Sequence, residues 1–323
     1  MEGAVSSSVA TRQETLVRGS AVDRIAVVTG GNKGIGFEVC RQLASSGVTV
    51  VLTARDETRG AEAVYKLTGL GLPDVIFHQL DVTDALSISR LAGFLKNRFG
   101  RLDILVNNAA IGAVELVDEP SFGRPQPTVE KFIDMDGHER VEWMWQNCRQ
   151  TYAAAKQGLQ TNFDGVKHIT EALLPLLLSS SDGRIVNVTS GFGLLRFFRS
   201  DELKQELDVD NLDEERLDEL LDAFLKDFEA GAVEARGWPA EFSAYKVAKA
   251  AMNASSRVMA RRHPALRVNC ADPGYVRTDM TRNSGLLAPE EGGATVVAVA
   301  LLPERGPTGA FFDAGGGKET SFV

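Results

Sequence analysis

Residues 24–36 read Arg24-Ile-Ala-Val-Val-Thr-Gly-Gly-Asn-Lys-Gly-Ile-Gly36. The apolar run that ends in glycines predicts a buried strand, and the helical spacing of Ile35, Val39 and Leu43 predicts a helix directly after it. A glycine-rich turn at such a junction lets the backbone approach a pyrophosphate, and the helix N-terminus offers free N–H groups to it. The spacing departs from plain G-x-G-x-x-G. We therefore expect a dinucleotide-binding turn, with a tight strand–helix junction that binds no ligand as the alternative.

Short apolar runs recur along the chain and alternate with helical patterns. Besides residues 24–29, they cover residues 48–53, 75–80, 102–107, 184–189, 266–271 and 309–313. This alternation predicts a parallel sheet covered by helices on both faces, and right-handed crossovers make such a sheet doubly wound. The predicted fold class is therefore α/β, a Rossmann-type doubly wound parallel sheet of seven strands.

Two long stretches, residues 113–160 and 192–241, interrupt the alternation. In the second, Asn211-Leu-Asp-Glu214 resembles a capping box, and Gly231 ends the run that follows. Between them, apolar residues at helical spacing predict an amphipathic helix with an acidic outer face; they are Leu217, Leu220, Leu221, Phe224, Leu225 and Phe228. We expect one Rossmann domain over residues 23–323, with a helical insertion before Tyr245. Residues 1–22 are predicted to be a disordered extension, with an organelle transit peptide as the alternative.

The bulk composition excludes several classes of function. The 323 residues are 44% hydrophobic, enough for a large core, and the formal net charge is −9. Without a basic stripe we expect no nucleic-acid partner, and an acidic chain without a long apolar run gives no reason to expect a membrane partner. The three cysteines show no C-x-x-C spacing, so we expect buried thiols in the cytoplasm, with no disulfide framework and no metal site.

The end of the second predicted strand indicates which dinucleotide binds. In an NAD site an acidic residue there contacts the ribose 2′-hydroxyl, whereas this strand ends in Arg55. A guanidinium matches a 2′-phosphate, and Lys33 in the glycine turn could add a second positive charge. We therefore predict NADP(H), although Asp56 could instead pair with Arg55. Asp81, after the third strand, is either an adenine contact or a turn residue.

The stretch Ser243-Ala-Tyr-Lys-Val-Ala-Lys249 suggests the chemistry. It places Tyr245 and Lys249 four residues apart on one helix face. Reducing a carbonyl needs a hydride donor and a proton donor, and a nearby cation would lower the tyrosine pKa from its usual value of about 10. Ser190, after the fifth strand, could hold the substrate oxygen. The alternative is a half-buried tyrosine beside a lysine that serves only packing.

Five features occur in order along the chain, namely the glycine turn, Asn107-Asn-Ala109, Ser190, Tyr245-x-x-x-Lys249 and Pro273-Gly-Tyr-Val-Arg-Thr278. Together they resemble the short-chain dehydrogenase/reductase family, over roughly residues 22–318. The resemblance implies that Tyr245 is the acid/base and that Ser190 positions the carbonyl, with Thr189 as a rival. It implies that Lys249 lowers the tyrosine pKa and holds the nicotinamide ribose, and that Asn162 links the lysine to solvent through water. The implied cofactor contacts, besides Tyr245 and Lys249, are Gly30, Asn32, Lys33, Gly34, Ile35, Gly36, Arg55, Asp81, Val82, Asn108, Pro273, Gly274, Val276 and Thr278.

Ser190 and Tyr245 are 55 positions apart, and the insertion between them resembles that of the carbonyl-reductase-like plant branch of salutaridine and menthone reductases and neomenthol dehydrogenase. The resemblance implies that the inserted helix covers a face used elsewhere for dimerisation, so we expect a monomer; a lid over the site is a compatible function of the same segment. The expected activity is reversible NADPH-dependent reduction of a ketone or aldehyde. An apolar pocket wall, expected at Phe192, Trp238, Tyr275 and Met280, would suit a terpenoid or alkaloid. The alternatives are a non-catalytic NADP(H)-binding regulator and a purely structural protein.

Overall fold

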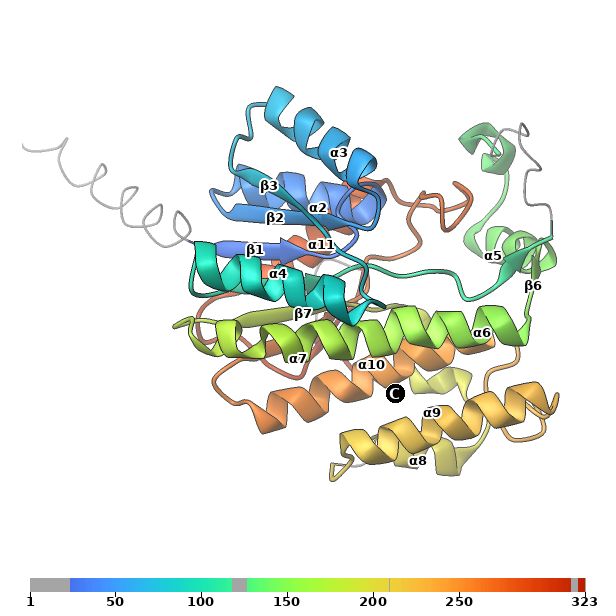
Figure 1. Cartoon of the computed structure of the whole chain (residues 1–323). Helices are drawn as coiled ribbons and strands as arrows, with labels where there is room; N and C mark the ends of the chain where they lie inside the picture. The colour runs from blue at the N-terminus through green and yellow to red at the C-terminus, as the bar shows by residue number, and fades with distance from the viewer. Residues whose placement is uncertain (1–23, 118–126, 209, 315–318, 323) are drawn as a thin grey trace, which may run out of the picture.

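The computed structural model describes residues 24–117, 127–208, 210–314 and 319–322 (Figure 1). The predicted disordered extension, residues 1–22, lies outside the described residues. A central sheet runs through the molecule in the order β10-β9-β8-β7-β4-β1-β2-β3. Its strands are β1 (Ile25–Val28), β2 (Thr49–Ala54), β3 (Val75–Gln79), β4 (Ile104–Asn107), β7 (Arg184–Val188), β8 (Arg267–Ala271), β9 (Phe311–Phe312) and β10 (Glu319–Thr320).

The seven predicted strands are all present, and every pairing from β3 across to β9 is parallel. The predicted α/β fold class is therefore confirmed. The sheet differs from the prediction in an eighth strand, β10, which pairs antiparallel with β9 at the edge. Two residues are too few for their alternation to stand out in the sequence.

Helices cover both faces of the sheet, as the crossovers require (Figure 1). On one face α2 (Gly34–Ser45), α3 (Glu57–Gly69) and α11 (Pro289–Ala300) pack over a core that includes Val39, Leu67 and Val296. On the other face α4 (Ala85–Arg98), α7 (Gly165–Leu178) and α10 (Ser243–Arg262) pack over Leu91, Leu173 and other apolar residues. None of the helices in the described ranges combines the length and apolar character that a bilayer span requires.

The first inserted stretch is a small lobe beside the sheet (Figure 1). It pairs β5 (Glu115–Leu116) with β6 (Cys148–Arg149) and contains the 3-10 turn η1 (Val129–Phe132) and α5 (Gly137–Gln146). The helix that holds Asn162 begins earlier than the predicted boundary at residue 160. It runs through α6 (Tyr152–Leu159) and the π-turn η2 (Gln160–Asp164) into α7, because Thr151 caps its N-terminus.

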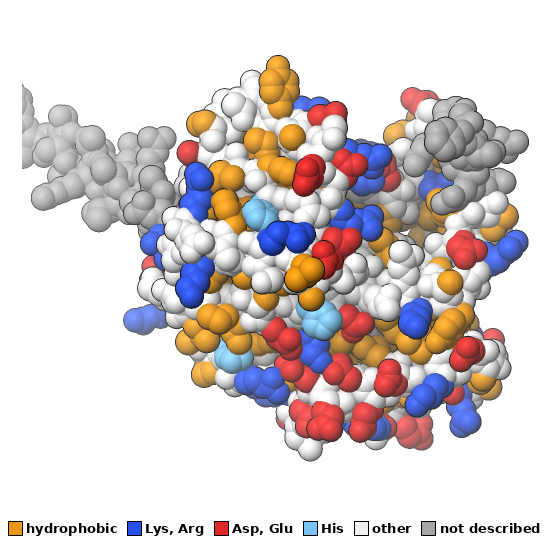
Figure 2. Space-filling view, viewed as in Figure 1, with side chains coloured by type: hydrophobic (Ala, Val, Ile, Leu, Met, Phe, Trp, Pro, Cys, Tyr) orange, Lys and Arg blue, Asp and Glu red, His pale blue; other side chains and the backbone are white. Residues whose placement is uncertain are grey.

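The second inserted stretch packs against α10 and α6 on the side away from the sheet (Figure 1). The 3-10 turns η3 (Gly191–Gly193) and η4 (Leu195–Phe197) lead into α8 (Asp201–Asp208) and α9 (Glu214–Glu229). The predicted apolar stripe of α9 is buried at Leu217 and Phe224. The capping-box prediction at Asn211 is wrong, because Asp213 is the N-cap and accepts a hydrogen bond from the Arg216 N–H. Figure 2 shows the acidic side chains gathered on the outer face of these two helices.

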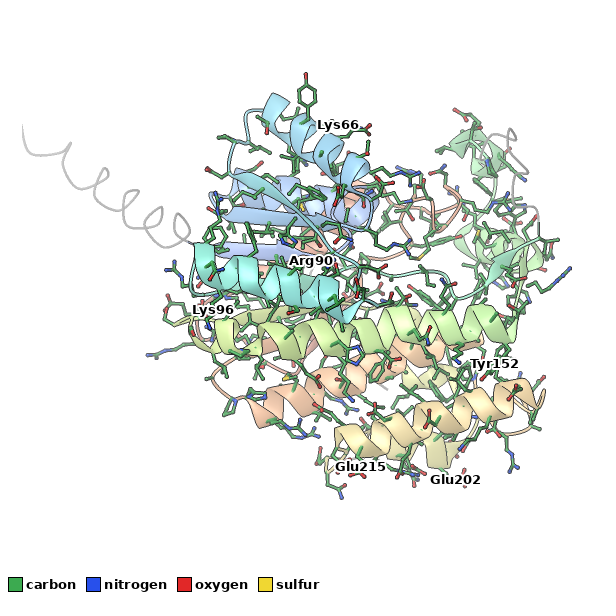
Figure 3. The ribbon with its side chains drawn as sticks, in the orientation of Figure 1. Lys66, Arg90, Lys96, Tyr152, Glu202 and Glu215 are labelled. Carbon is green, nitrogen blue, oxygen red and sulfur yellow. The ribbon has the colours of Figure 1, made fainter. Side chains whose placement is uncertain are left out.

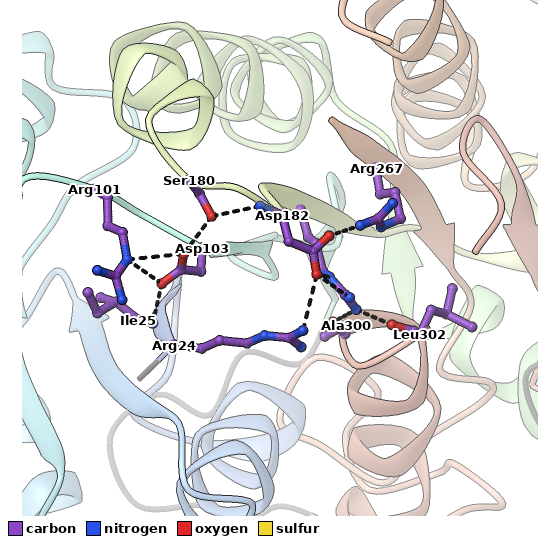
Figure 4. A network of polar contacts seen from close by, with 10 residues as sticks. Arg24, Ile25, Arg101, Asp103, Ser180, Asp182, Arg267, Ala300 and Leu302 are labelled. Carbon is purple, nitrogen blue, oxygen red and sulfur yellow. Dashed lines mark hydrogen bonds and ion pairs between the residues drawn. The ribbon is translucent and has the colours of Figure 1, made fainter. Parts of the chain in front are cut away.

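A network of charged side chains connects the amino-terminal ends of the parallel strands (Figure 4). The Asp182 carboxylate pairs with Arg24, Arg184 and Arg267, which lie on or next to three different parallel strands. Asp103 accepts a hydrogen bond from the Ile25 N–H at 2.8 Å and another from Ser180. These charges therefore lie at the amino-terminal ends of the strands, and the polar residues of the candidate site lie at the carboxyl-terminal ends.

Candidate active site

The glycine turn after β1 forms a cradle at the carboxyl edge of the sheet. Gly30 and Gly34 have φ values of 66° and 55°, a left-handed conformation that side chains disfavour. A Cβ on Gly36 would lie 2.4 Å from the Gly30 carbonyl oxygen, so this position also requires glycine. Within the described chain no side chain caps the N-terminus of α2, which leaves its first N–H groups free for a ligand.

The end of β4 holds this turn in place. The Asn108 side-chain amide donates to the carbonyl oxygens of Thr29 at 2.9 Å and Gly30 at 3.2 Å. The Thr29 hydroxyl in return accepts from the N–H groups of Asn108 and Ala109, both at 2.9 Å. Asn108 was predicted as a cofactor contact, and in the structure its amide braces the loop that would bind the cofactor.

The predicted phosphate-binding cations stand at one end of this cradle. Arg55 follows β2, is exposed, and its guanidinium makes no hydrogen bond or ion pair with the other described residues. Asp56 does not pair with it, because its carboxylate caps α3 and accepts from the Arg59 N–H at 2.9 Å. Lys33 is exposed as well, and its ammonium lies 2.5 Å from a carboxylate oxygen of Asp279.

The residues after β3 line the same edge. The Asp81 carboxylate accepts from the N–H and the hydroxyl of Thr83, at 2.9 and 2.7 Å, through one of its two oxygens. Asp81 thus lies in a turn, which was one of the two roles predicted for it. The N-cap of α4 is Asp84. Val82 is buried against Gly165, where an added Cβ would approach it to 2.8 Å. Neither observation tests the predicted adenine contact.

Ser190, Tyr245 and Lys249 come together where β7 and α10 meet. The Lys249 ammonium is buried, 2% exposed, and donates to the carbonyl oxygen of Val188 at 2.7 Å. It lies 5.7 Å from the centre of the Tyr245 ring. The Ser190 hydroxyl accepts from the Phe192 N–H at 3.1 Å and also forms a side-chain hydrogen bond with Tyr245. The rival Thr189 is buried, and its hydroxyl has no hydrogen-bond partner within the described chain.

The electrostatics of the pair differ from the sequence prediction. Burial raises the pKa of Tyr245 to about 12, the negative charge of Asp272 adds to the rise, and hydrogen bonding to Ser190 opposes it. Burial lowers the pKa of Lys249 to about 8, against the raising effects of Cys270 and Asp272. The expected lowering of the tyrosine pKa by Lys249 is therefore not found, because burial lowers the pKa of Lys249 below that of Tyr245 and the lysine is neutral where the phenol titrates.

Asn162 lies in the π-turn that joins α6 and α7, a helix irregularity that is frequent at functional sites. Its side chain is fully buried, accepts from the Ile111 N–H at 2.8 Å and donates to the Ile111 carbonyl at 2.9 Å. This amide pair fixes the loop after β4 beside the glycine turn. The predicted water link from Asn162 to Lys249 stays a prediction.

The loop that begins at Pro273 closes over the glycine turn from the other side. A Cβ on Gly34 would lie 3.3 Å from the Thr278 side chain, and Lys33 pairs with Asp279 in the same loop. Val276 is 2% exposed and forms an isolated bridge with Leu287. The loop therefore lies beside the glycine turn, and the cofactor contacts predicted for Pro273, Gly274, Val276 and Thr278 stay a prediction.

This arrangement can be compared with known proteins. Residues 24–200 match the family model described as short chain dehydrogenase. The chain belongs to this family of oxidoreductases. It is similar to the solved structure of salutaridine reductase from Papaver somniferum, at 43% identity and a TM-score of 0.80 over 89% of this chain and 99% of that one.

Two further relatives show the same full-length match. The solved menthone neomenthol reductase from Mentha piperita is 39% identical, with a TM-score of 0.76 over 90% of this chain and 99% of that one. Carbonyl reductase [NADPH] 1 from Homo sapiens is 38% identical over 298 residues, which are 89% of this chain and 95% of that protein. The likeness therefore extends through both insertions of this short-chain dehydrogenase.

The two inserted stretches bring aromatic rings to the start of the Tyr245 helix. The Phe242 ring lies 5.1 Å from Trp145 of the first stretch and 5.9 Å from Phe192 of the second. Phe242 has a φ of 47°, a conformation that costs a non-glycine residue about 1–2 kcal/mol, and these ring contacts offset that cost. The rings of Phe192 and Phe197 in turn lie 5.1 and 4.7 Å from the Lys246 ammonium.

One predicted pocket residue of this short-chain dehydrogenase does not belong to the site. Trp238 is buried between Phe198 and Phe224, and its indole N–H donates to Asp227 at 2.9 Å. It therefore packs α9 onto the body of the enzyme. Met280 is 39% exposed. The Tyr275 hydroxyl bonds to Ser284 within the loop after β8, and Phe192 lies two residues after Ser190; the places of Tyr275, Met280 and Phe192 in the pocket wall stay predictions.

Two residues that the sequence analysis missed hold the site together. Gln150 donates to the Ala240 carbonyl at 2.8 Å and accepts from the Ser243 N–H at 2.6 Å, so the first inserted stretch fixes the start of α10. Asp272 bridges two loops beside Tyr245. Its position directly after a strand, at the edge where ligands bind in such sheets, is a signal that could have identified it. Gln150 carries no such signal, because its partners lie some 90 positions away.

Proposed function

We propose that this chain is an NADP(H)-dependent carbonyl reductase. The observation that carries the proposal is the meeting of Ser190, Tyr245 and Lys249 beside the glycine cradle, under the loop that begins at Pro273. A hydroxyl, a half-buried phenol and a buried ammonium at one sheet edge are the groups needed to bind a carbonyl oxygen and protonate it.

The residues present fit the cofactor. The cradle is shaped by glycines whose backbone would admit a pyrophosphate, and the α2 N-terminus supports its negative charge. Arg55 is exposed and unpaired within the described ranges, which suits a ribose 2′-phosphate. The similar human protein is named for NADPH. The cofactor is NADP(H), held by the glycine turn, Arg55 and the loop from Pro273.

Each catalytic residue has a distinct task. When held by the glycine turn and the loop from Pro273, NADPH would supply the hydride that the carbonyl carbon needs. Ser190 donates a hydrogen bond to the carbonyl oxygen and orients it toward Tyr245. Tyr245 gives its phenolic proton to that oxygen. Lys249 lies beside Tyr245, and among the described residues it is the only lysine whose ammonium lies within 6 Å of the centre of the Tyr245 ring. Since burial raises the pKa of Tyr245 to about 12, the phenol is protonated at neutral pH and holds the proton that the carbonyl oxygen would receive.

The surroundings favour an apolar, bulky substrate. Phe192 follows Ser190 by two residues, and its ring stacks on Phe242, which precedes Tyr245 by three. These two stacked rings, close in sequence to Ser190 and Tyr245, form an apolar wall suited to a hydrocarbon skeleton. The similar solved enzymes are named for salutaridine and for menthone and neomenthol. The substrate class is therefore the carbonyl group of a terpenoid or an alkaloid.

The second inserted stretch accounts for a proposed monomeric state. Its helix α9 buries Leu217 and Phe224 against the outer side of α6 and α10, and presents acidic side chains to solvent (Figure 2). With this face covered, the Tyr245 helix has no apolar surface there for a second copy. Light scattering on a sizing column is expected to give the mass of one chain, and a dimer mass would contradict it. The three free thiols fit a cytoplasmic site.

The proposal is tested by NADPH consumption with a panel of terpenoid, alkaloid, quinone and aliphatic carbonyls, with NADH as the comparison cofactor. We expect turnover on cyclic terpenoid or alkaloid ketones and a strong preference for NADPH. Tight NADPH binding without oxidation by any member of the panel would contradict a reductase and favour the non-catalytic regulator.

A further inference from the structure

Asp272 occupies a position between the two loops that flank the catalytic pair. The register that pairs Val188 with Ala271 sets the ends of β7 and β8 side by side. The residues after both strands therefore leave the sheet together, Ser190 and Gly191 from one and Asp272 from the other. Asp272 is partly buried at this point.

Both carboxylate oxygens of Asp272 accept hydrogen bonds from backbone N–H groups. One oxygen accepts from Gly191 at 2.8 Å, directly after Ser190, and the other accepts from Gly274 at 2.9 Å, directly after Pro273. The fit is close, since a Cβ on Gly191 would lie 3.0 Å from the carboxylate. A single side chain thus joins the loop that orients the carbonyl to the loop that covers the cofactor. Two N–H donors on two oxygens also suit the ionised form.

The charge of Asp272 acts on both members of the catalytic pair. The groups that interact with it are Tyr245 and Lys249 on α10 and Asp313, which follows β9. Its charge raises the pKa of Tyr245 and that of Lys249, whose pKa Cys270 also raises. Burial and Asp313 raise the pKa of Asp272 itself, while the two N–H groups and Lys249 oppose them.

We propose that Asp272 is a positioning residue of this active site, which ties the Ser190 loop to the loop from Pro273 and supplies the negative charge beside the Tyr245–Lys249 pair. The inference rests on the proposed function, because it assigns Asp272 a part in the carbonyl reduction. It acts through Ser190, Tyr245 and Lys249 and touches neither substrate nor cofactor in this assignment.

The test uses the full chain with Asp272→Asn and Asp272→Ser, which remove the charge, and Asp272→Glu, which keeps the charge but displaces the oxygens. Glu215→Gln is the matched control, because it removes one exposed carboxylate at the start of α9, far from the site (Figure 3). Two readouts are followed from pH 6 to 10: the Kd of NADPH by fluorescence, and kcat/KM with an active carbonyl from the panel.

The basic limb is the part of each pH profile where NADPH affinity or kcat/KM falls as the pH rises. In Asp272→Asn and Asp272→Ser this limb is expected to lie at a pH lower by at least about half a unit in both profiles, because the charge that favours the Lys249 ammonium is gone. Asp272→Glu is expected to keep the limb and to lower kcat about 10- to 100-fold through misplacement of Ser190. Glu215→Gln should match the wild type.

Neutral variants with an unmoved limb in both readouts would overturn the proposal. If neither neutral variant folds, the test rests on Asp272→Glu. An unchanged kcat would contradict the proposal that Asp272 ties the two loops together, and a lowered kcat with an unmoved basic limb would support it. Failure of this proposal can be told apart from failure of the proposed function. A wild type that turns over no carbonyl on the panel still gives the pH profile of the NADPH Kd, and the Asp272 variants are compared with it.

Discussion

Replacing Lys249 by methionine should change how the stability of the protein depends on pH. The ammonium is 2% exposed, and its partner within the described residues is the neutral Val188 carbonyl. Burial accordingly lowers its pKa to about 8, from about 10.5 in an unfolded chain. Methionine keeps the length and the apolar stem of the side chain and removes the charge.

The sign and size follow from proton linkage. Between pH 8 and 10.5 the unfolded chain holds a proton on Lys249 that the folded chain has released, so the free energy of unfolding rises with pH across this window. Below pH 8 both states are protonated and the buried charge destabilises the fold. Above pH 10.5 both are neutral and that cost has gone. A shift of this size corresponds to about 3 kcal/mol over the whole window.

Urea unfolding at pH 7, 8, 9 and 10, without cofactor, measures this dependence. Burial raises the pKa of the Cys40 and Cys270 thiols, which makes every variant lose stability over the same range, so only the difference between proteins is informative. The wild type should gain about 2 kcal/mol relative to Lys249→Met between pH 8 and 10. Lys66→Met, at an exposed lysine on α3, is the matched control (Figure 3). Parallel curves for the wild type and Lys249→Met would refute the reasoning.

Three further perturbations test the cradle, the cofactor choice and the inserted helix. Gly36→Ala should weaken NADPH binding at least about tenfold and lower Tm, because the added Cβ meets the Gly30 carbonyl at 2.4 Å; calorimetric titration showing wild-type affinity would contradict this. Arg55→Ala should raise the Kd of NADPH about 10- to 100-fold and leave that of NADH unchanged, whereas the control Arg59→Ala should change neither; equal losses for both cofactors would disprove the 2′-phosphate contact. Phe224→Ala should lower the free energy of unfolding in urea by about 3–5 kcal/mol, since the ring is fully buried against Phe228 and Trp238; a loss below about 1 kcal/mol would show that α9 contributes little.

The sheet and the glycine turn could be predicted because their signals are local. The parallel strands are short, mainly apolar runs, and the turn between Thr29 and Gly36 needs glycines for reasons of backbone geometry alone. Ser190 and Tyr245 were assigned by their places after a strand and on a helix, and the packing of α10 against the end of β7 brings them together. The pattern also identified the buried face of α9.

The missed features depend on contacts between distant segments. Trp238 was expected in an apolar pocket wall, but its hydrogen bond to Asp227 and the rings beside it are made only once α9 has docked. The pKa of Tyr245 was expected to fall, because spacing shows that Lys249 is near but not that burial lowers the pKa of Lys249 itself to about 8. Asp272 acts through two N–H groups on separate loops, a relation that no spacing encodes.

The most direct test of the central claim is the turnover of Tyr245→Phe with NADPH and a carbonyl that the wild type reduces. Removing the phenolic oxygen takes away the proton donor and leaves the ring, the glycine cradle and Arg55 in place. We predict a fall in kcat of about 10²–10⁴-fold, with the Kd of NADPH within about threefold of the wild type. A Tyr245→Phe protein that reduces the carbonyl at the wild-type rate would contradict the account.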